Sequence, residues 1–244
     1  MKKIYFLALS CAVLLSMASC SLDDTKNQQV LSGYFTITGS YPNYKLIHDN
    51  GSIIVYPSTE EVSEVTKKEG FGNHKRIYFD VYYYEDDVKT ANGISSISNV
   101  DLKNGAYLTE DTPITKEEAD KAGITAKDSI FAVSTMDHCW LAQGYLNTTF
   151  KANYSLTVNE ENEVVGIKPT AKLCITNLAD NAVTFTMYYN RHTNRDADYY
   201  PGSFGYSFDI TKLNIPGDKD SVTITFETEN VKASTIKVPR TFFK

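Results

Sequence analysis

The residues that could act as nucleophiles, acid–base groups or metal ligands do not have the spacing that a catalytic or metal site requires. Gly202-Ser203-Phe204-Gly205 comes nearest to a serine nucleophile, but it lacks the G-x-S-x-G spacing of a strand-to-helix turn. Acidic residues such as Asp86 and Asp196 are frequent, and a pair of carboxylates cleaves a glycosidic bond only at a suitable separation in space. His138 has no second cluster of cysteine or histidine with which to bind a metal. The sequence therefore predicts a protein that is not an enzyme and has neither a metal nor a cofactor.

The amino terminus carries a clear processing signal. Two lysines precede an apolar run from Ile4 to Leu15, and small residues then lead to Cys20, which is the pattern of an export signal. The run is shorter than the roughly 20 residues that a membrane-spanning helix needs. Ser16-Met17-Ala18-Ser19-Cys20 resembles a lipobox. This predicts a diacylglyceryl group on the Cys20 thiol and removal of residues 1–19, with cleavage of an ordinary signal peptide as the alternative.

Lipidation would hold the exported protein on its membrane, because each buried CH₂ contributes about 0.8 kcal/mol and two acyl chains anchor stably. Residues 20–29 are polar and predict a flexible tether that reaches about 30 Å when extended. Asp23 and Asp24 resemble the signal that sends Bacteroidetes lipoproteins to the outer face of the outer membrane. The expected location is therefore the outer membrane, with exposure at the cell surface.

Cys139 and Cys174 are the two cysteines that remain for other chemistry. A disulfide between them would suit an exported protein, would close a loop of about 35 residues and would stabilise the fold by roughly 3 to 4 kcal/mol. The alternative is a pair of small buried thiols on strands that never meet. The sequence leaves both interpretations open.

Tyrosines are the most suggestive residues for binding, because the chain has 17 of them and several cluster. The alternation predicts that Tyr78, Tyr82 and Tyr84 share the wet face of one strand, while Tyr199 and Tyr200 lie in a predicted long loop. Exposed aromatic rings can stack on sugars or anchor a protein partner. The alternative is that this face packs against a second domain, since tyrosine also suits half-buried strands.

The charge of the chain argues against nucleic-acid binding. The formal net charge is −6, and removal of the signal with its two lysines makes it −8. Affinity for phosphates requires clustered lysine and arginine, and the sequence has no such cluster. We therefore expect no nucleic-acid partner.

Runs of alternating aromatic and β-branched residues, separated by Gly, Asn, Asp and Pro, predict an all-β fold with almost no helix. Asp49-Asn50-Gly51 is expected to be a hairpin turn in which the Asn-Gly pair supplies positive φ angles. Thr115-Lys116-Glu117-Glu118 is a capping box that predicts a short helix ending near Gly123. This helix marks a linker at residues 111–125. The seven strand candidates beyond it predict an antiparallel β-sandwich at residues 126–244.

The arrangement resembles the NigD-like lipoproteins of Bacteroidetes. The likeness is carried by the lipobox and by four further segments, which are Asp49 to Pro57, Arg76 to Tyr84, Trp140 to Asn147, and Phe204 to Leu213 leading to Val222. The resemblance implies an N-terminal domain of OB-fold type, a small barrel, at residues 30–110, and a C-terminal sandwich. Because the family takes its name from a bacteriocin-associated gene cluster, the resemblance also suggests immunity or another protective role in the envelope.

The leading hypothesis is a non-catalytic, lipid-anchored envelope protein that binds a partner at the outer membrane. A surface lipoprotein that binds a glycan is the alternative, and the tyrosines favour it. A fimbrial subunit is disfavoured, because no basic cleavage site lies between Cys20 and Gly33.

Overall fold

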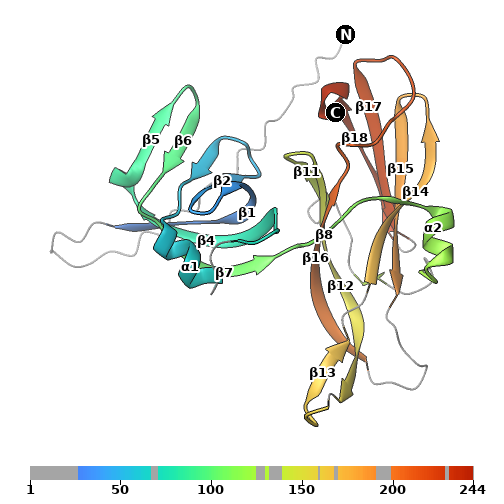
Figure 1. Ribbon diagram of the computed structural model, residues 1–244. Helices are drawn as coiled ribbons and strands as arrows, with labels where there is room; N and C mark the ends of the chain where they lie inside the picture. The colour runs from blue at the N-terminus through green and yellow to red at the C-terminus, as the bar shows by residue number, and fades with distance from the viewer. Residues whose placement is uncertain are drawn as a thin grey trace.

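The computed structural model describes residues 27–66, 71–124, 130–131, 139–158, 160–167, 170–190, 199–228 and 231–243. This part of the chain is all-β, as the sequence predicts (Figure 1). The predicted signal peptide, Cys20 and residues 21–26 of the predicted tether lie outside it. Over the described ranges, no helix is long and apolar enough to cross a membrane.

Residues 28–107 form one seven-stranded sheet with the strand order β5-β6-β3-β2-β1-β4-β7. The strands are β1 (Gln28–Ser40), β2 (Asn43–His48), β3 (Ile53–Val55), β4 (Arg76–Tyr84), β5 (Val88–Ala91), β6 (Ile94–Ile97) and β7 (Asp101–Tyr107). Strand β1 begins inside the range expected for the tether, because Gln28 already pairs with Tyr84. We refer to this unit as the N-terminal sheet.

The N-terminal sheet has its core on one face, because alternate residues of a strand point to opposite sides. Ile77, Phe79 and Val81 of β4 are buried together with Phe35 of β1, so the predicted alternation of β4 is confirmed. We call the opposite side of β1, β4 and β7 the outer face. It carries Tyr34, Tyr78, Asp80, Tyr82 and Tyr84.

The N-terminal sheet is open, whereas a small barrel was expected. Among the described residues, β5 and β7 end the sheet and no pairing joins them. Helix α1 (Thr59–Thr66) packs beside β7 instead, since Val62 is buried in the core and the Glu61 carboxylate accepts the backbone N–H of Leu102. A helix thus covers an edge that a closing strand would have paired. Sequence reasoning missed α1, although Ser58 caps it by accepting the Glu61 N–H at 3.1 Å.

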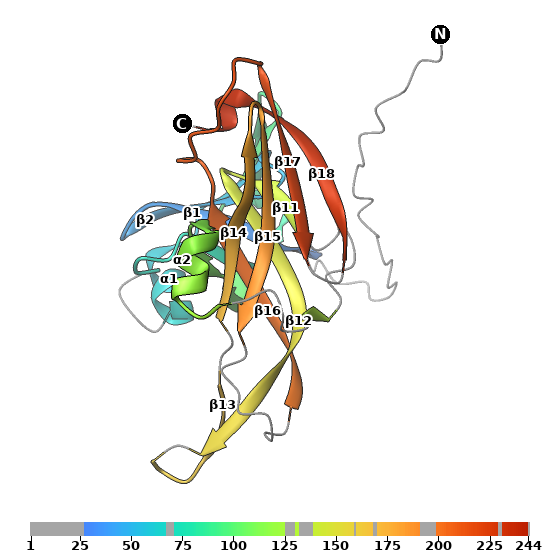
Figure 2. The ribbon, with the colours of Figure 1, turned by 90° about the vertical axis from the view of Figure 1, so that its right-hand side faces the viewer.

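The remaining strands form a β-sandwich, as predicted (Figures 1 and 2). One sheet holds β8 (Thr109–Asp111), β10 (Ile130–Phe131), β11 (Cys139–Ala142), β12 (Tyr145–Val158), β13 (Val164–Ile167) and β16 (Tyr199–Asp209). The other holds β9 (Ile114–Thr115), β14 (Thr170–Ala179), β15 (Ala182–Asn190), β17 (Ser221–Thr228) and β18 (Val231–Pro239). Residues of both sheets share one core, for example Phe150, Phe208, Phe185 and Ile224.

The sandwich is mixed, whereas purely antiparallel sheets were expected. Strands β15 and β17 are parallel, because the intervening β16 lies in the other sheet and the chain crosses the sandwich twice between them. Strands β8 and β9 also run parallel to their neighbours β16 and β14. Strand β9 and Asp111 of β8 belong to the predicted linker at residues 111–125, and Thr109 and Glu110 of β8 belong to the range predicted for the N-terminal domain.

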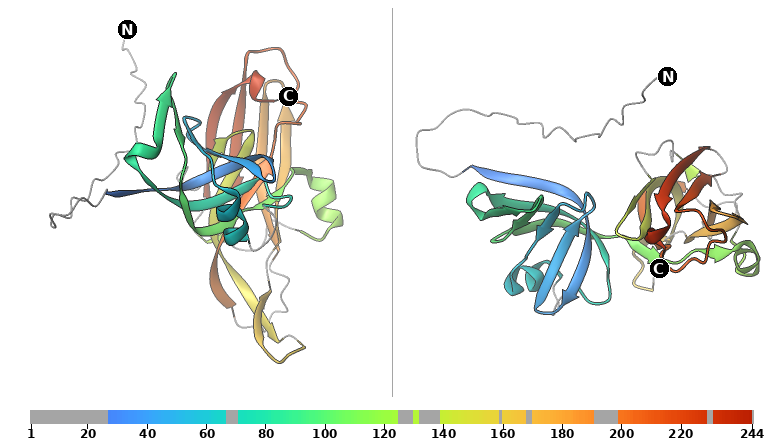
Figure 3. Two further views of the ribbon diagram at one scale, coloured as in Figure 1. Left: turned by 60° about the vertical axis from the view of Figure 1, so that its left-hand side comes forward. Right: turned by 90° about the horizontal axis from the view of Figure 1, so that it is seen from above.

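The predicted capping box is confirmed. Thr115 Oγ1 accepts the Glu118 N–H at 3.2 Å, and Glu118 Oε2 accepts the Thr115 N–H at 2.7 Å. Helix α2 (Lys116–Lys121) follows, and Gly123 has a φ of +67°, which suits the left-handed position that ends a helix. Seen from above, the N-terminal sheet and the sandwich lie side by side (Figure 3).

Candidate functional site at the junction of the two units

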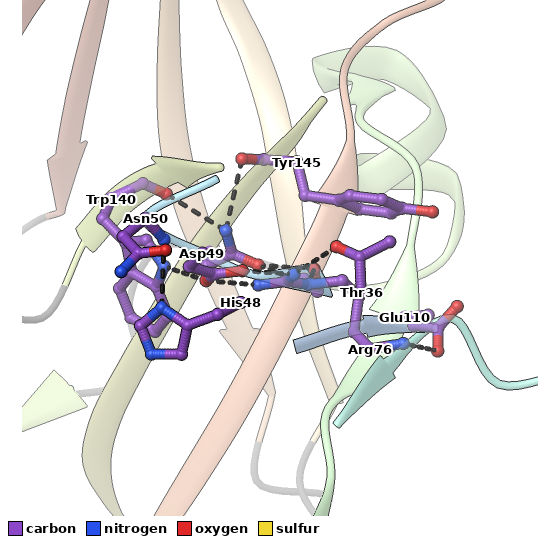
Figure 4. Close-up of polar contacts among 10 residues, drawn as sticks. Thr36, His48, Asp49, Asn50, Arg76, Glu110, Trp140 and Tyr145 are labelled. Carbon is purple, nitrogen blue, oxygen red and sulfur yellow. Dashed lines mark hydrogen bonds and ion pairs between the residues drawn. The ribbon is translucent and has the colours of Figure 1, made fainter. Parts of the chain in front are cut away.

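A network of polar contacts joins the N-terminal sheet to the sandwich, and Arg76 lies at its centre (Figure 4). Arg76 is the first residue of β4, and its side chain is 0% exposed. A buried guanidinium is costly unless its charge is paired and its N–H groups are hydrogen-bonded. Both units supply those partners.

Asp49 neutralises Arg76 with a bidentate ion pair. Arg76 Nη1 donates to Asp49 Oδ1 and Arg76 Nη2 to Asp49 Oδ2, each at 2.6 Å. This geometry matches the planar guanidinium to the planar carboxylate. Asp49 lies in the turn between β2 and β3, where the Gly51 N–H donates to the His48 carbonyl at 2.8 Å. The turn therefore presents the carboxylate to β4.

The turn differs from the expected one in its backbone conformation. Of the Asn50-Gly51 pair only Gly51 has a positive φ, at +74°. Asn50 contributes hydrogen bonds instead, because its Oδ1 accepts the Ser52 N–H at 2.9 Å and its own N–H donates to His48 Nδ1 at 3.2 Å. Four residues separate β2 from β3, so this loop needs the left-handed conformation at one position only.

Trp140 extends the ion pair into the sandwich. Its indole N–H donates to Asp49 Oδ2 at 2.6 Å, so one carboxylate accepts bonds from both units. The Trp140 ring also packs against Tyr34 of β1, with ring centroids 4.7 Å apart. The indole N–H of this partly buried side chain needs an acceptor, and here the acceptor belongs to the other unit.

Asn147 and Ser207 bind the opposite side of the guanidinium. They are cross-strand partners in β12 and β16 and both are fully buried. Arg76 Nε lies 3.2 Å from Asn147 Oδ1 and 3.2 Å from Ser207 Oγ, and Ser207 Oγ donates to Asn147 Oδ1 at 2.6 Å. Side chains of two sandwich strands therefore hydrogen-bond to Arg76, a residue of the N-terminal sheet.

Thr36, Glu110 and Tyr145 complete the surroundings of Arg76. Thr36 Oγ1 accepts from Arg76 Nη1 at 2.6 Å, and Glu110 Oε1 of β8 accepts the Arg76 backbone N–H at 2.9 Å. The Tyr145 ring centroid is 5.5 Å from Arg76 Cζ, within the range of a cation–π contact. We call the set of Thr36, Asp49, Arg76, Trp140, Asn147 and Ser207 the Arg76 junction.

The Arg76 junction is suited to holding two units together rather than to catalysis. Both oxygens of Asp49 accept bonds from Arg76 or Trp140, so this carboxylate is engaged as a structural acceptor. The neighbouring His48 is partly buried, and burial lowers its pKa. Its Nδ1 already accepts the Asn50 N–H. The Asp49 carboxylate and His48 Nδ1 are thus engaged in fixing the junction and the turn.

Sequence reasoning named the parts of the Arg76 junction without connecting them. The sequence predicts a hairpin turn at Asp49, and it places Arg76 and Trp140 in two of the segments that carry the family likeness. A single arginine beginning an aromatic strand was the available signal, because a buried arginine requires a distant carboxylate. The sequence does not identify that carboxylate, because Asp49 lies 27 residues from Arg76 and meets it only through the tertiary fold.

The tyrosines predicted to share a face do so. Tyr78, Tyr82 and Tyr84 lie on the outer face, where Tyr78 and Tyr82 are half-buried and Tyr84 is exposed. The Tyr78 ring packs edge-on against Tyr34, with centroids 5.3 Å apart. The row of rings therefore reaches the Arg76 junction through Tyr34 and Trp140.

Tyr199 and Tyr200 are not part of this group. They begin β16 instead of lying in a loop, and they pair with Ser155 and Tyr154. Ser207 touches Arg76, and Tyr200 lies seven residues away along the same strand, which is about 23 Å at 3.3 Å per residue. The fold therefore separates the two predicted tyrosine clusters.

The disulfide between Cys139 and Cys174, one of the two alternatives that the sequence leaves open, is not formed. Both are free and buried, Cys139 in the core of the sandwich and Cys174 beside α2 with Ala119 and Tyr188. They lie on strands of different sheets. Burial raises the pKa of each thiol to about 12. The structure thus agrees with the alternative of two buried thiols on strands that do not meet.

Cys20, the predicted lipidation site, lies outside the described residues. Within the described ranges, no group of three or more His, Cys, Asp or Glu side chains is placed to hold a metal ion.

Comparison with known proteins shows likeness in fold. No protein-family model and no curated protein matches the sequence. Among solved structures, a protein named as toxin-related from Parabacteroides distasonis is 14% identical with a TM-score of 0.59, over 88% of this chain and 96% of that chain. A NigD-like immunity protein from Bacteroides caccae is 15% identical with a TM-score of 0.50, over 86% and 96%. A protein named as a lipoprotein from Bacteroides fragilis is 10% identical with a TM-score of 0.50, over 87% and 98%.

These similarities extend over most of each chain and span both the N-terminal sheet and the sandwich. They agree with the resemblance found in the sequence. The chain has the two-unit, all-β fold of the NigD-like immunity protein and of the lipoprotein to which it is similar.

Proposed function

We propose that this chain is a non-catalytic, lipid-anchored protein of the bacterial envelope that binds a partner at the outer membrane. The observation that carries the proposal is the Arg76 junction, whose charged groups are engaged in holding the two units as one body. A rigid body with an exposed aromatic face is suited to recognition, because little conformational entropy is lost on binding.

The names of the similar structures support a role in the envelope. One is named as an immunity protein and another as a lipoprotein, and none of the three names describes an enzyme. The lipobox at Cys20 supports the anchor, and β1 begins only eight residues later, at Gln28. We infer that the protein acts close to the membrane, as a bacteriocin immunity or envelope-protection protein would.

The anchor is tested by mass spectrometry and cell fractionation. The mature protein should begin at Cys20 with acyl chains attached and should be found in the outer membrane fraction. Cys20→Ala should release it from the membrane. An unmodified amino terminus, or a Cys20→Ala variant that stays in the membrane fraction, contradicts the anchor.

Protection is tested by deleting the gene in its native host. Cells are then challenged with bacteriocin-containing supernatants of competing Bacteroidetes strains. Deletion should increase killing, the wild-type gene should restore survival, and Cys20→Ala should fail to restore it. Equal survival with and without the gene argues against the protective role.

A further inference from the structure

The outer face of the N-terminal sheet has a regular pattern of aromatic, polar and apolar rows. The register of β1 with β4 sets three rows, which are Tyr34 with Tyr78, Ser32 with Asp80, and Val30 with Tyr82. Successive rows are about 7 Å apart, because they are two strand residues apart. Tyr84 follows the last row and is 37% exposed, and Val30 is 51% exposed. Aromatic surface thus flanks a polar centre on both sides.

The aromatic part of the pattern is held in place by its neighbours. Tyr34 contacts both Tyr78 and Trp140 through its ring, and Trp140 is fixed by its bond to Asp49. Lys103 of β7 lies over the Tyr82 ring, 4.7 Å from its centroid. Rings that are already positioned lose little entropy when a ligand stacks on them.

Asp80 gives the polar row a hydrogen-bond acceptor. The Tyr78 hydroxyl donates to its Oδ1 at 3.0 Å, and Asn104 Nδ2 donates to its Oδ2 at 2.6 Å. Hydrogen bonds from Asn104 and then Ser32 lower the pKa of Asp80, so it stays ionised. A carboxylate offers about four acceptor positions, and these three donors leave room for one more hydroxyl.

The charges of the outer face select against anionic ligands. Lys103 forms an ion pair with Asp101 at 2.6 Å, so its charge is already balanced and that of Asp80 is left over. The acidic turn Glu85–Asp87 follows directly after Tyr84. Phosphates, nucleic acids and anionic lipid headgroups would be repelled here. The surface instead suits an uncharged ligand that has both apolar faces and many hydroxyls.

We propose that the outer face binds a neutral oligosaccharide. One sugar ring stacks on Tyr84 and the next lies against Tyr82 beside Lys103. A sugar hydroxyl donates to Asp80, and the Lys103 ammonium donates to a second hydroxyl. The inference rests on the proposed recognition role and names the chemistry of the partner. Its position fits a surface lipoprotein, because Gln28 pairs with Tyr84 and the tether from the proposed anchor therefore ends at this face.

The test uses the mature chain from residue 20 onwards, purified in detergent, and four neutral probes: cellohexaose, xylohexaose, mannohexaose and maltohexaose. Binding is followed by calorimetry and by the emission of Trp140, the one tryptophan of the chain, which contacts Tyr34. At least one hexaose should bind saturably. Tyr82→Ala and Tyr84→Ala should each weaken that binding about threefold to tenfold, as expected for loss of one aromatic contact.

Two matched variants separate recognition from folding. Tyr84→Phe keeps the ring and should keep most of the affinity. Tyr56→Ala removes a tyrosine that is equally exposed, at 38%, but follows β3, away from β1 and β4, and it should leave binding unchanged. The proposal is overturned if none of the four hexaoses binds, or if Tyr56→Ala weakens hexaose binding as much as Tyr82→Ala does. Either result leaves the anchor and the protective role standing, because those are measured in cells by other assays.

Discussion

Removal of the Asp49 carboxylate should destabilise the protein far more than the loss of a surface charge. Asp49→Ala leaves the Arg76 guanidinium, 0% exposed, without its counter-charge and takes the acceptor from the Trp140 N–H. An uncompensated buried charge of this kind costs about 3 to 5 kcal/mol. The total stability of a folded domain is only about 5 to 15 kcal/mol, so the expected loss is a large share of it.

The assay is urea unfolding followed by Trp140 emission, because this tryptophan reports the junction itself. With a denaturant slope of about 2 to 3 kcal/mol per molar, a loss of about 3 to 5 kcal/mol should lower the midpoint for Asp49→Ala by roughly 1 to 2.5 M. The shift should depend little on salt, since buried pairs are poorly screened. A fall that corresponds to less than about 1 kcal/mol, the usual value of an exposed pair, refutes the reasoning.

The double variant Asp49→Leu with Arg76→Met supplies the control. Removal of both partners eliminates the buried charge as well as the ion pair, and replacements of this kind are often much less destabilising than removal of one partner. The double variant should therefore unfold at a higher urea concentration than Asp49→Ala. A lower midpoint would mean that Asp49 matters through the turn and not through the charge.

Three further outcomes follow from the structure. Glu118 has a lowered pKa, chiefly because it accepts the backbone N–H of Thr115 at the helix cap. The wild type should therefore be more stable than Glu118→Gln by the full amount above pH 4.5, the ordinary pKa of the group. Denaturation experiments should show that this difference disappears as the pH falls through the lowered pKa. Cys139 and Cys174, with pKa values of about 12, should react with a thiol reagent only after unfolding, and their failure to react in denaturant would reveal a disulfide. Gly33→Ala would place its Cβ 2.3 Å from His48 Nε2 and should lower stability by about 1 to 3 kcal/mol, which a thermal melt would detect as a lower Tm.

The parts of the fold that follow from local physics could be predicted. The alternation of β4 identified its buried and exposed sides, and the capping box of α2 satisfies its own backbone groups, so neither depends on distant residues. The open N-terminal sheet could not be predicted, because it depends on Glu61 reaching Leu102, 41 residues away. The short strands β8 and β9 contain three and two residues, too few to show a period.

The candidate site was predictable in its exposed part and hidden in its buried part. The aromatic side of β4 follows from a two-residue period, whereas its extension through Tyr34 and Trp140 depends on how the two units meet. Asp49 lies in a polar turn, and from the sequence alone such a turn could equally well be exposed to solvent. Only the position of Arg76 in three dimensions shows that this turn faces inward.

Strands β8 and β9 have a practical consequence for chimeric proteins. Since these short segments pair with β16 and β14, a hybrid that exchanges the first half between relatives should be cut before Thr109. In a hybrid cut at helix α2, strands β8 and β9 would come from the other relative. They would then be edge strands whose side chains do not match the two sheets of the sandwich. The fusion point of a chimera should therefore lie directly after Leu108, before the charged segment that the sequence predicts to be a linker.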